Sequence, residues 1–305
     1  MERTLTYNIT QNDIPNTIHS FLRAKGYSSQ IIKELKKEPE RILIDGKWKY
    51  TKHTLKAGET LTIHIQEEGI SEKITPVPME LDIVYEDEDI IVVNKANGVV
   101  VHPAVGNNHG TLVNGLMYHS KHLSNINGEF RPGIVHRIDA YTTGLLVVAK
   151  NNQAHEYLAH QLEEKTTHRK YVALVWGVIN NQTGTIDAPI GRDEIDRKKM
   201  AVTANNSKYA ITHFSVLKRF ENATLIEVKL ETGRTHQIRV HMNYIGHPVV
   251  NDPVYGNKKI IDDSGQCLHA KELGFVHPKT HEYMEFSSEL PACFINILNQ
   301  FEGED

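Results

Sequence analysis

The chain is poor in the features that mark secreted, disulfide-linked or membrane proteins. Only two of its 305 residues are cysteines, Cys267 and Cys293, and they form no CxxC pair. Neither a disulfide framework nor a zinc knuckle is therefore indicated. No apolar run approaches the roughly 18 residues that a membrane span needs. The first residues show no basic segment followed by an apolar one, so we expect no secretory signal. These absences predict a cytoplasmic protein with no membrane partner.

Several short catalytic motifs are also missing. The sequence has no GxxxxGK[ST] loop, which argues against phosphoryl transfer from a nucleotide. Among its 18 histidines, the pairs His236/His241 and His277/His281 are closely spaced, but neither has the context of a zinc-binding HExxH helix. His236 and His241 are five residues apart, and Pro278 interrupts the pair formed by His277 and His281. We therefore expect no metal site.

The charge of the chain is distributed unevenly. The formal net charge is -4, yet residues 23–56 contain ten Lys or Arg and only four acids. The acids gather elsewhere, for example in the run Glu86–Asp89. A local positive charge permits phosphate neutralisation on a nucleic acid. A solvated charged face would have the same composition, so the charge alone does not decide between the two.

Residues 14–65 predict a small α/β unit. Apolar residues recur at helical spacing on either side of a break at residues 26–28, where Ser28 is a candidate N-cap. These residues are Ile18 and Leu22, followed by Ile31, Ile32 and Leu35. Residues 42–44 then predict a strand that runs into an Asp45-Gly46 turn, and residues 55–65 predict a turn and an alternating strand.

Charged residues, Gly69, Pro76 and Pro78 predict an extended spacer between this unit and the rest of the chain. We place the first domain at residues 1–70, the linker at 71–80 and the second domain at 81–305. The second domain has helical patterns near residues 152–165 and from about residue 235. Its short β-rich runs are residues 81–85, 90–94, 144–149, 170–175 and 224–230. Many strands without regular βα alternation predict an α+β fold with a mostly antiparallel mixed sheet.

Two residues are candidates for chemistry. Asp139 is followed by Thr142, Thr143 and a glycine, a context in which an aspartate commonly caps the amides of its own turn. Arg234 directly precedes Thr235, a candidate helix N-cap. An arginine there could pair with a buried carboxylate and hold it ionised, form a structural salt bridge, or contact a phosphate.

Five segments, in this order, resemble the RluA-type family of RNA pseudouridine synthases, which includes the bacterial ribosomal large-subunit synthase D. They are LDIVYEDEDIIVVNKANGVVVHP (81–103), HRIDAYTTGLL (136–146), KYVALVWG (170–177), TGRTHQIRVH (232–241) and GHPVVNDPVYG (246–256). The order of elements in residues 14–65 similarly resembles the S4 RNA-binding domain, which often precedes the catalytic domain in this family.

The resemblance implies roles for individual residues of the second domain. Asp139 would be the catalytic aspartate that attacks or deprotonates the target uridine, and Arg234 would be its ion-pair partner. Tyr171 would stack on the uracil, and Leu230 would close the pocket. The reaction breaks the bond between N1 and C1′, turns the base and rejoins it through C5, without a metal or redox cofactor.

Further residues would contact the RNA. Arg137 would occupy the place of the base once it has left its stack, a step that costs a few kcal/mol, and His136 belongs to the same binding segment. In the S4-like domain the contacts would be Lys33, Lys36, Lys37 and Arg41. The implied partner is ribosomal RNA, with transfer RNA as the alternative, and we expect a monomer.

Two other functions are compatible with parts of the sequence. The chain could be an S4-bearing RNA-binding or assembly factor whose synthase-like domain is inactive. It could also be a hydrolase that uses Asp139 and a histidine, although the sequence has no GxSxG elbow and no paired acids.

Overall fold

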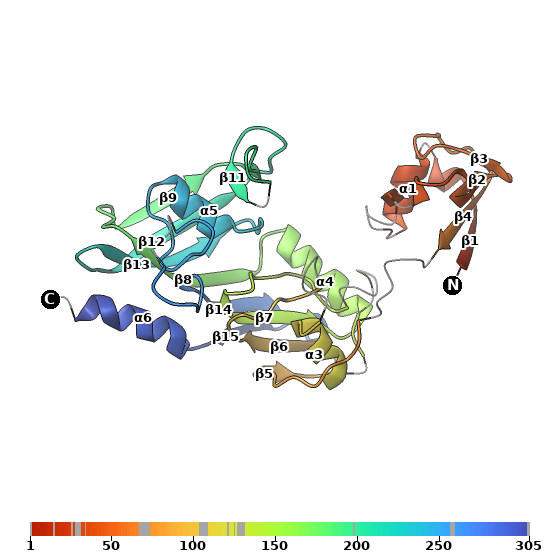
Figure 1. Ribbon diagram of the computed structural model, residues 1–305. Helices are drawn as coiled ribbons and strands as arrows, with labels where there is room; N and C mark the ends of the chain where they lie inside the picture. Colours follow the sequence, from red (N-terminus) through yellow and green to blue (C-terminus); the bar gives the residue numbers. More distant parts are fainter. Residues whose placement is uncertain are drawn as a thin grey trace. The chain divides into compact units, whose positions relative to one another are not determined.

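The computed structural model describes residues 2–14, 16–25, 27, 32–33, 35–66, 74–103, 109–120, 122–124, 126, 132–197, 199–256 and 260–303. The predicted N-cap Ser28, its neighbour Ile31 and the linker residue Gly69 lie outside these ranges. The chain divides into two compact units (Figure 1). Unit 1 is Met1–Thr75 with Ile126–Phe130, and unit 2 is Pro76–Asn125 with Arg131–Asp305. Among the helices of the described residues, none has the length and hydrophobicity that crossing a bilayer requires.

Unit 1 contains a four-stranded sheet with the strand order β1-β4-β2-β3. Its elements are β1 (Glu2–Asn8), η1 (Gln11–Asp13), α1 (Ile18–Ala24), η2 (Pro39–Arg41), β2 (Ile42–Ile44), β3 (Lys47–Trp48) and β4 (Thr60–Gln66). The predicted strands at residues 42–44 and 60–65 are present. Strand β1 was not predicted, and it pairs antiparallel with β4 so that Leu5 faces Ile63.

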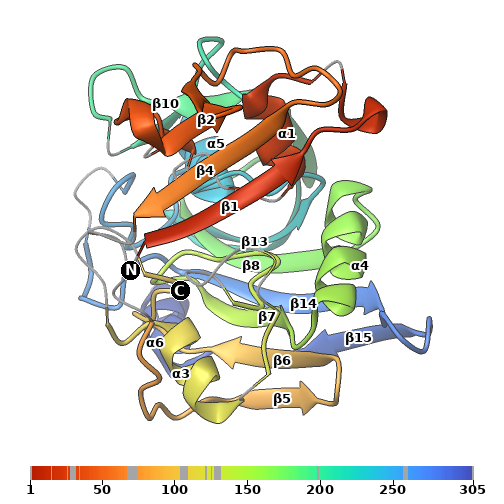
Figure 2. The same cartoon turned by 90° about the vertical axis from the view of Figure 1, so that its right-hand side faces the viewer.

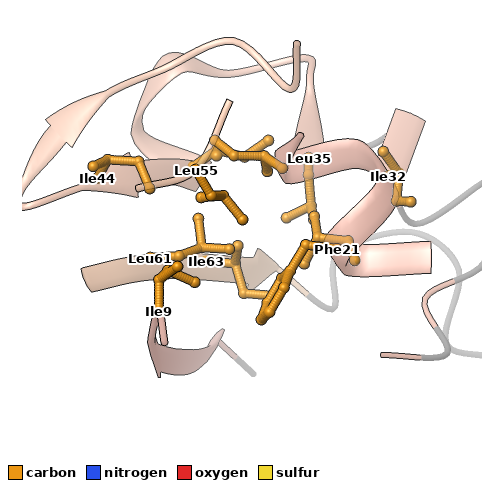
Figure 3. Close-up of a cluster of buried hydrophobic side chains, with 11 residues drawn as sticks. Ile9, Phe21, Ile32, Leu35, Ile44, Leu55, Leu61 and Ile63 are labelled. Carbon is orange, nitrogen blue, oxygen red and sulfur yellow. The ribbon is translucent and has the colours of Figure 1, made fainter. Parts of the chain in front are cut away.

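The core of unit 1 lies between this sheet and the helical segments (Figure 3). Alternate residues of the strands point into it, because successive side chains of a strand face opposite sides. Ile42 and Ile44 are buried while Leu43 between them is only partly so. The helical segments contribute Ile18, Phe21, Leu22, Ile32 and Leu35 to the same cluster. The apolar residues predicted to share a helix face are thus core residues where they are described.

Unit 2 contains most of the strands. They are β5 (Ile83–Glu86), β6 (Ile90–Lys95), β7 (Thr143–Ala149), β8 (His168–Trp176), β9 (Thr183–Asp187), β10 (Ile190–Arg192), β11 (Met200–Val202), β12 (Ile211–Arg219), β13 (Ala223–Leu230), β14 (Leu268–Val276) and β15 (Tyr283–Ser287). The helices are α3 (Leu112–His119), α4 (Asn152–Glu163), α5 (Gln237–Tyr244) and α6 (Ala292–Glu302).

One large sheet organises unit 2. Its order is β5-β6-β7-β14-β8-β13-β12-β9, with β15 paired to β14, and Figure 2 shows β5, β6, β7 and β14 side by side. Only the β7–β14 pair is parallel within this sheet, and its other pairs are antiparallel. The α+β class with a mostly antiparallel mixed sheet is therefore confirmed. Strands β10 and β11 form a separate two-stranded sheet.

Helices α4 and α6 cover different parts of this sheet. The side chain of Asn151 accepts a hydrogen bond from the amide of Ala154 and so caps α4. Ala154 and Leu158 of α4 pack on the cluster that contains residues of β7 and β14. Helix α6 packs Phe294, Ile297 and Phe301 against residues of β8. The central strands are thereby buried, and they form a rigid base for the loops at their ends.

The point where the chain enters β7 requires a glycine. Gly144 has a φ of +108°, and a Cβ at this position would lie 2.3 Å from the carbonyl oxygen of Ala270. Strand β14 can therefore approach β7 closely only because residue 144 has no side chain. On its other side Gly144 faces Lys95 of β6. The segment that ends at this glycine, which contains Asp139, is thus tied to two neighbouring strands.

Candidate active site

Asp139 lies in the loop that leads into β7. The amide of Thr142 donates to the carbonyl oxygen of Asp139 at 3.1 Å, which closes a turn. Gln266 in turn donates from Nε2 to the Thr142 hydroxyl at 3.0 Å. The turn is therefore held by backbone and by neighbouring side chains. The carboxylate of Asp139, 16% exposed, is available for other contacts.

The cation beside Asp139 is Arg239. Its Nη1 donates to Oδ2 of Asp139 at 2.9 Å. The other side of the guanidinium binds Asp252 with two hydrogen bonds, from Nε to Oδ2 at 2.7 Å and from Nη2 to Oδ1 at 2.8 Å. The Arg239 side chain is only 5% exposed. A planar guanidinium fixed on one edge by a carboxylate presents its remaining donors in a fixed direction.

The prediction that Arg234 forms this ion pair is wrong. Nε of Arg234 donates instead to the carbonyl oxygen of Tyr209 at 2.9 Å. The reason is the backbone between the two arginines. His236, not Thr235, is the N-cap residue of α5, and its left-handed conformation, with φ 57° and ψ 21°, turns the chain just before the helix. Arg239 then falls on the buried part of α5, whereas Arg234 stays in the preceding loop.

Asp252 is held from several directions. Its Oδ1 also accepts hydrogen bonds from the amides of Val254 and Tyr255, at 2.8 and 3.0 Å. The ring of Tyr255 lies under the Arg239 guanidinium, with 5.1 Å from Cζ to the ring centroid. The hydroxyl of Tyr255 is hydrogen-bonded to Nδ1 of His236 at 2.9 Å. These contacts fix the guanidinium before any substrate binds.

The ion pairs keep these groups charged despite their burial. Burial opposes the charge of Arg239, yet its hydrogen bonds to Asp252 and its proximity to Asp139 raise the pKa of Arg239 above the usual value. Burial likewise opposes ionisation of Asp252, but the hydrogen bonds from Arg239 and from two amides lower the pKa of Asp252. Arg239 and Asp252 therefore form a buried ion pair, and the same guanidinium is hydrogen-bonded to Asp139.

Lys95, at the end of β6, lies on another side of the Asp139 turn. Its Nζ donates to the carbonyl oxygens of Ala140 at 2.7 Å and Ala96 at 2.8 Å. The residue is fully buried. Burial lowers the pKa of Lys95 to about 7, and the charge of Asp139 acts in the opposite direction. Lys95 thus holds the backbone of the residue that follows Asp139.

Tyr171 and Leu230 were predicted to shape the pocket. Tyr171 is in β8, is 7% exposed and pairs with Ala270 of β14 and Val228 of β13. Burial raises the pKa of Tyr171, while the charge of Arg169 acts in the opposite direction and the carboxylate of Asp139 adds a smaller increase. Leu230 is half-buried at the end of β13.

The two residues before Ile138 have different surroundings. Arg137 is exposed, and its Nη1 lies 3.3 Å from Nε2 of His102. His136 accepts a hydrogen bond at Nε2 from the amide of Val147 at 3.1 Å. Burial, with the nearby charge of Arg169, lowers the pKa of His136 to about 3. His136 is therefore a neutral side chain hydrogen-bonded to β7, while Arg137 extends toward solvent.

Sequence reasoning missed Arg239, Asp252 and Lys95. Each had a signal. Arg239 lies in α5 between the buried residues Ile238 and Val240. An arginine at such a position is expected to be buried as well, and a buried charge needs a partner. Asp252 precedes a proline in a turn, and Lys95 ends the apolar strand β6. These signals indicate buried charges, but they do not say which residues pair.

One group of possible metal ligands occurs among the described residues, formed by Asp87, Asp89 and His277 within 4.8 Å of one another. Their atoms already have partners in the protein. Nδ1 of His277 accepts from the amides of Lys279 and Thr280, which places the proton on Nε2, and Nε2 donates to Asp87 at 2.8 Å. The hydrogen bonds explain this cluster as a structural network.

Comparison with known proteins bears on this site directly. The family model for RNA pseudouridylate synthase matches residues 89–244, a range that includes both Asp139 and Arg239. The chain is 55% identical over 258 residues to the "Uncharacterized RNA pseudouridine synthase YlyB" of Bacillus subtilis, covering 85% of this chain and 84% of that protein. It is 44% identical over 272 residues to the ribosomal large subunit pseudouridine synthase D of Pseudomonas aeruginosa, covering 85% and 83%.

A solved structure agrees with these relatives. The human RNA pseudouridylate synthase domain containing 1 superposes with a TM-score of 0.58 at 27% identity, and the match covers 73% of this chain and 95% of that one. Sequence and fold lead to the same family, and the alternatives of an inactive assembly factor and a hydrolase are not favoured. The chain belongs to the RNA pseudouridylate synthases and is an RluA-type pseudouridine synthase, an isomerase whose substrate is RNA.

Proposed function

We propose that this protein isomerises specific uridines of large-subunit ribosomal RNA, with Asp139 as the catalytic aspartate. The observation that carries the proposal is the ion pair between Asp139 and Arg239, because it holds a carboxylate of limited exposure next to a fixed cation. The name of the Pseudomonas aeruginosa relative supports the choice of ribosomal RNA.

Such a carboxylate is suited to this reaction. The bond between N1 and C1′ breaks, the uracil turns, and a bond between C5 and C1′ forms. The proton lost from C5 is balanced by one gained at N1, so no atom enters or leaves. Asp139 would attack or deprotonate the nucleoside, and it must be ionised to do either. Arg239 donates to Oδ2 of Asp139 at 2.9 Å, and Asp252 orients the guanidinium from its other side.

The target base must leave its stack before it reaches Asp139, which is half-buried. We assign Arg137 to the place that the base vacates. The exposed guanidinium of Arg137 is two residues from Asp139 and can stack on or hydrogen-bond to neighbouring bases. Tyr171 would stack on the displaced uracil, and Leu230 would form an apolar wall.

The test is chemical mapping of pseudouridine in ribosomal and transfer RNA transcripts after incubation with purified protein. Wild type is expected to modify large-subunit ribosomal RNA. Asp139→Asn keeps the size of the side chain and removes its charge, so it is expected to abolish the product while RNA binding remains. Asp263→Asn, at an exposed aspartate, is the matched control and should be fully active. Product formed by Asp139→Asn would refute the role of Asp139, and product on transfer RNA alone would refute the substrate.

Unit 1 would bind the same RNA as an S4-like domain. Lys33, Lys36 and Lys37 are exposed, as phosphate contacts need to be. Arg41 is engaged inside the protein, where Nη2 binds Glu38 at 2.6 Å. We therefore expect replacement of the three lysines by glutamine to weaken RNA binding and reduce its salt dependence. If the salt dependence of RNA affinity is the same in the glutamine variant as in wild type, these lysines do not contact the RNA.

A further inference from the structure

Two large aromatic side chains contact each other on the surface of unit 1. The ring centroids of Trp48 and Tyr50 are 4.2 Å apart, and the rings are tilted by 59°. Trp48 is 41% exposed and Tyr50 is 71% exposed. Burying an aromatic ring contributes substantially to stability, so two adjacent rings left in water are unusual for a small unit. The core of unit 1 does not use them, since neither belongs to its buried cluster.

The pair lies on the side of the sheet that faces away from this core. Trp48 is opposite Leu43 in the antiparallel pair β2–β3, and residues opposite each other share a face. Ile42 and Ile44 on either side of Leu43 point into the core, so Leu43 and Trp48 point away from it. Strand β3 is also at one edge of the sheet. The rings are therefore open from the face and from the edge.

The sequence around the pair is basic. Residues 42–56 contain four lysines and a single acid, Asp45. Oδ1 of Asp45 accepts the amide of Thr60 at 2.9 Å. All four lysines are exposed, and within the part of the chain that the structure describes none of them forms an ion pair with a carboxylate. They are Lys47, Lys49, Lys52 and Lys56. Their charge is thus available to an external anion.

We infer that Trp48 and Tyr50 form a stacking site for unpaired bases of the RNA substrate, with the surrounding lysines at its phosphates. Aromatic rings bind any base through its π face, and positive side chains follow the backbone, which is the combination that single-stranded RNA requires. Because the two rings are tilted rather than parallel, a base would stack on the outer face of a ring and not between them. A duplex offers no free base faces and would not use the rings.

This inference rests on the RNA substrate of the family and is independent of the chemistry at Asp139. The test is the affinity of the full-length protein for a short labelled oligouridylate and for an RNA duplex. Trp48→Ala/Tyr50→Ala is expected to bind the oligouridylate about tenfold or more weakly. The duplex should bind with unchanged affinity. Trp48→Phe/Tyr50→Phe keeps the rings and is expected to retain most of the affinity.

The control is Tyr118→Ala, which removes a tyrosine of similar exposure from α3 in unit 2 and should leave binding unchanged. Oligouridylate binding that is unaffected by the double alanine substitution would overturn the inference. An equal loss for the duplex would also overturn it, because phosphate contacts would then explain the effect. If the double alanine variant binds oligouridylate weakly but still forms pseudouridine at saturating RNA, the aromatic site acts in binding and not in catalysis.

Discussion

Oδ2 of Asp139 and Nη1 of Arg239 are 2.9 Å apart although 100 residues separate them in the chain. Arg239 reaches this position because Asp252 fixes its opposite side with two hydrogen bonds. The geometry of Asp139 therefore depends on a residue that does not touch it. This arrangement distinguishes the roles of the two arginines in the TGRTHQIRVH segment.

Arg239→Met should be far more damaging than Arg234→Met. The first substitution leaves two carboxylates without their cation, and breaking a buried ion pair costs about 3–5 kcal/mol. We also expect at least a roughly 100-fold lower kcat. Arg234→Met removes one hydrogen bond to a carbonyl and should cost less than about 1.5 kcal/mol. Denaturant unfolding and single-turnover kinetics measure both effects. Equal losses for the two variants would contradict the assignment of the ion pair to Arg239.

Tyr171→Phe separates two possible contributions of this side chain. Phenylalanine keeps the ring that would stack on uracil and removes the hydroxyl. If the hydroxyl takes part in proton transfer, kcat falls by about 100-fold while KM stays constant. We expect this result. Tyr171→Leu should lower kcat and raise KM together, because it removes the ring as well. If the Tyr171→Phe enzyme is fully active, the hydroxyl has no part in proton transfer and Tyr171 acts only through its ring.

Lys95→Met is expected to change the pH dependence of stability. Burial lowers the pKa of Lys95 to about 7 in the folded protein, whereas an unfolded lysine titrates near 10.4. The unfolded state thus binds more protons between these values, and stability rises with pH from about 7 to 10, by up to about 1.4 kcal/mol per pH unit. The variant should lose this slope. It should also lose activity, because the carbonyl of Ala140 loses its partner.

His269 should make unit 2 sensitive to acid. Its ring is buried between the Thr143 and Ser288 hydroxyls, and burial lowers the pKa of His269 to about 4. Unfolded histidine titrates near 6.5, so the unfolded state takes up the proton first and stability falls as the pH drops from about 6.5 to 4.

The measurement is urea unfolding followed by the fluorescence of Trp176 in a Trp48→Phe background, which reports on unit 2 alone. His269→Gln should flatten the acid dependence, although it also lowers stability at pH 7. His122→Gln, at an exposed histidine, is the control and should leave the curve unchanged. If the stability of unit 2 still falls between pH 6.5 and 4 in the His269→Gln protein, the effect is due to other buried histidines and not to His269.

The candidate site was only partly predictable from the sequence. The segment containing Asp139 stands out because polar residues directly precede a buried strand, but on that pattern alone Asp139 would be a turn cap, and its expected role came from the family resemblance. Its arginine was misplaced by five residues, because the helix start depends on the left-handed conformation of His236, which is uncommon for any residue other than glycine. Lys95 and Asp252 were missed because no local pattern shows that Lys95 binds the carbonyl of Ala140, 45 residues away, or that Asp252 binds Arg239, 13 residues away.

The helices and strands with a clear local pattern of apolar residues were predicted correctly from the sequence. The predicted helix at residues 152–165 is α4, and the predicted apolar runs are β5, β6, β7, β8 and β13. Strand β1 was not predicted, although Leu5, Tyr7 and Ile9 alternate with polar residues, and it pairs with β4, more than 50 residues away. The domain boundaries and the S4-like character of residues 1–70 remain predictions.

The position of β7 has a consequence for the order of folding. This strand lies between β6 and β14, whose residues are separated from each other by well over 100 positions. A nascent chain that has not yet reached Leu268 cannot form the contact between Gly144 and Ala270 that anchors the Asp139 turn. Closing such long loops is slow because their entropy is lost before the contacts form. The turn that holds Asp139 therefore reaches its folded position only after strand β14 has been synthesised.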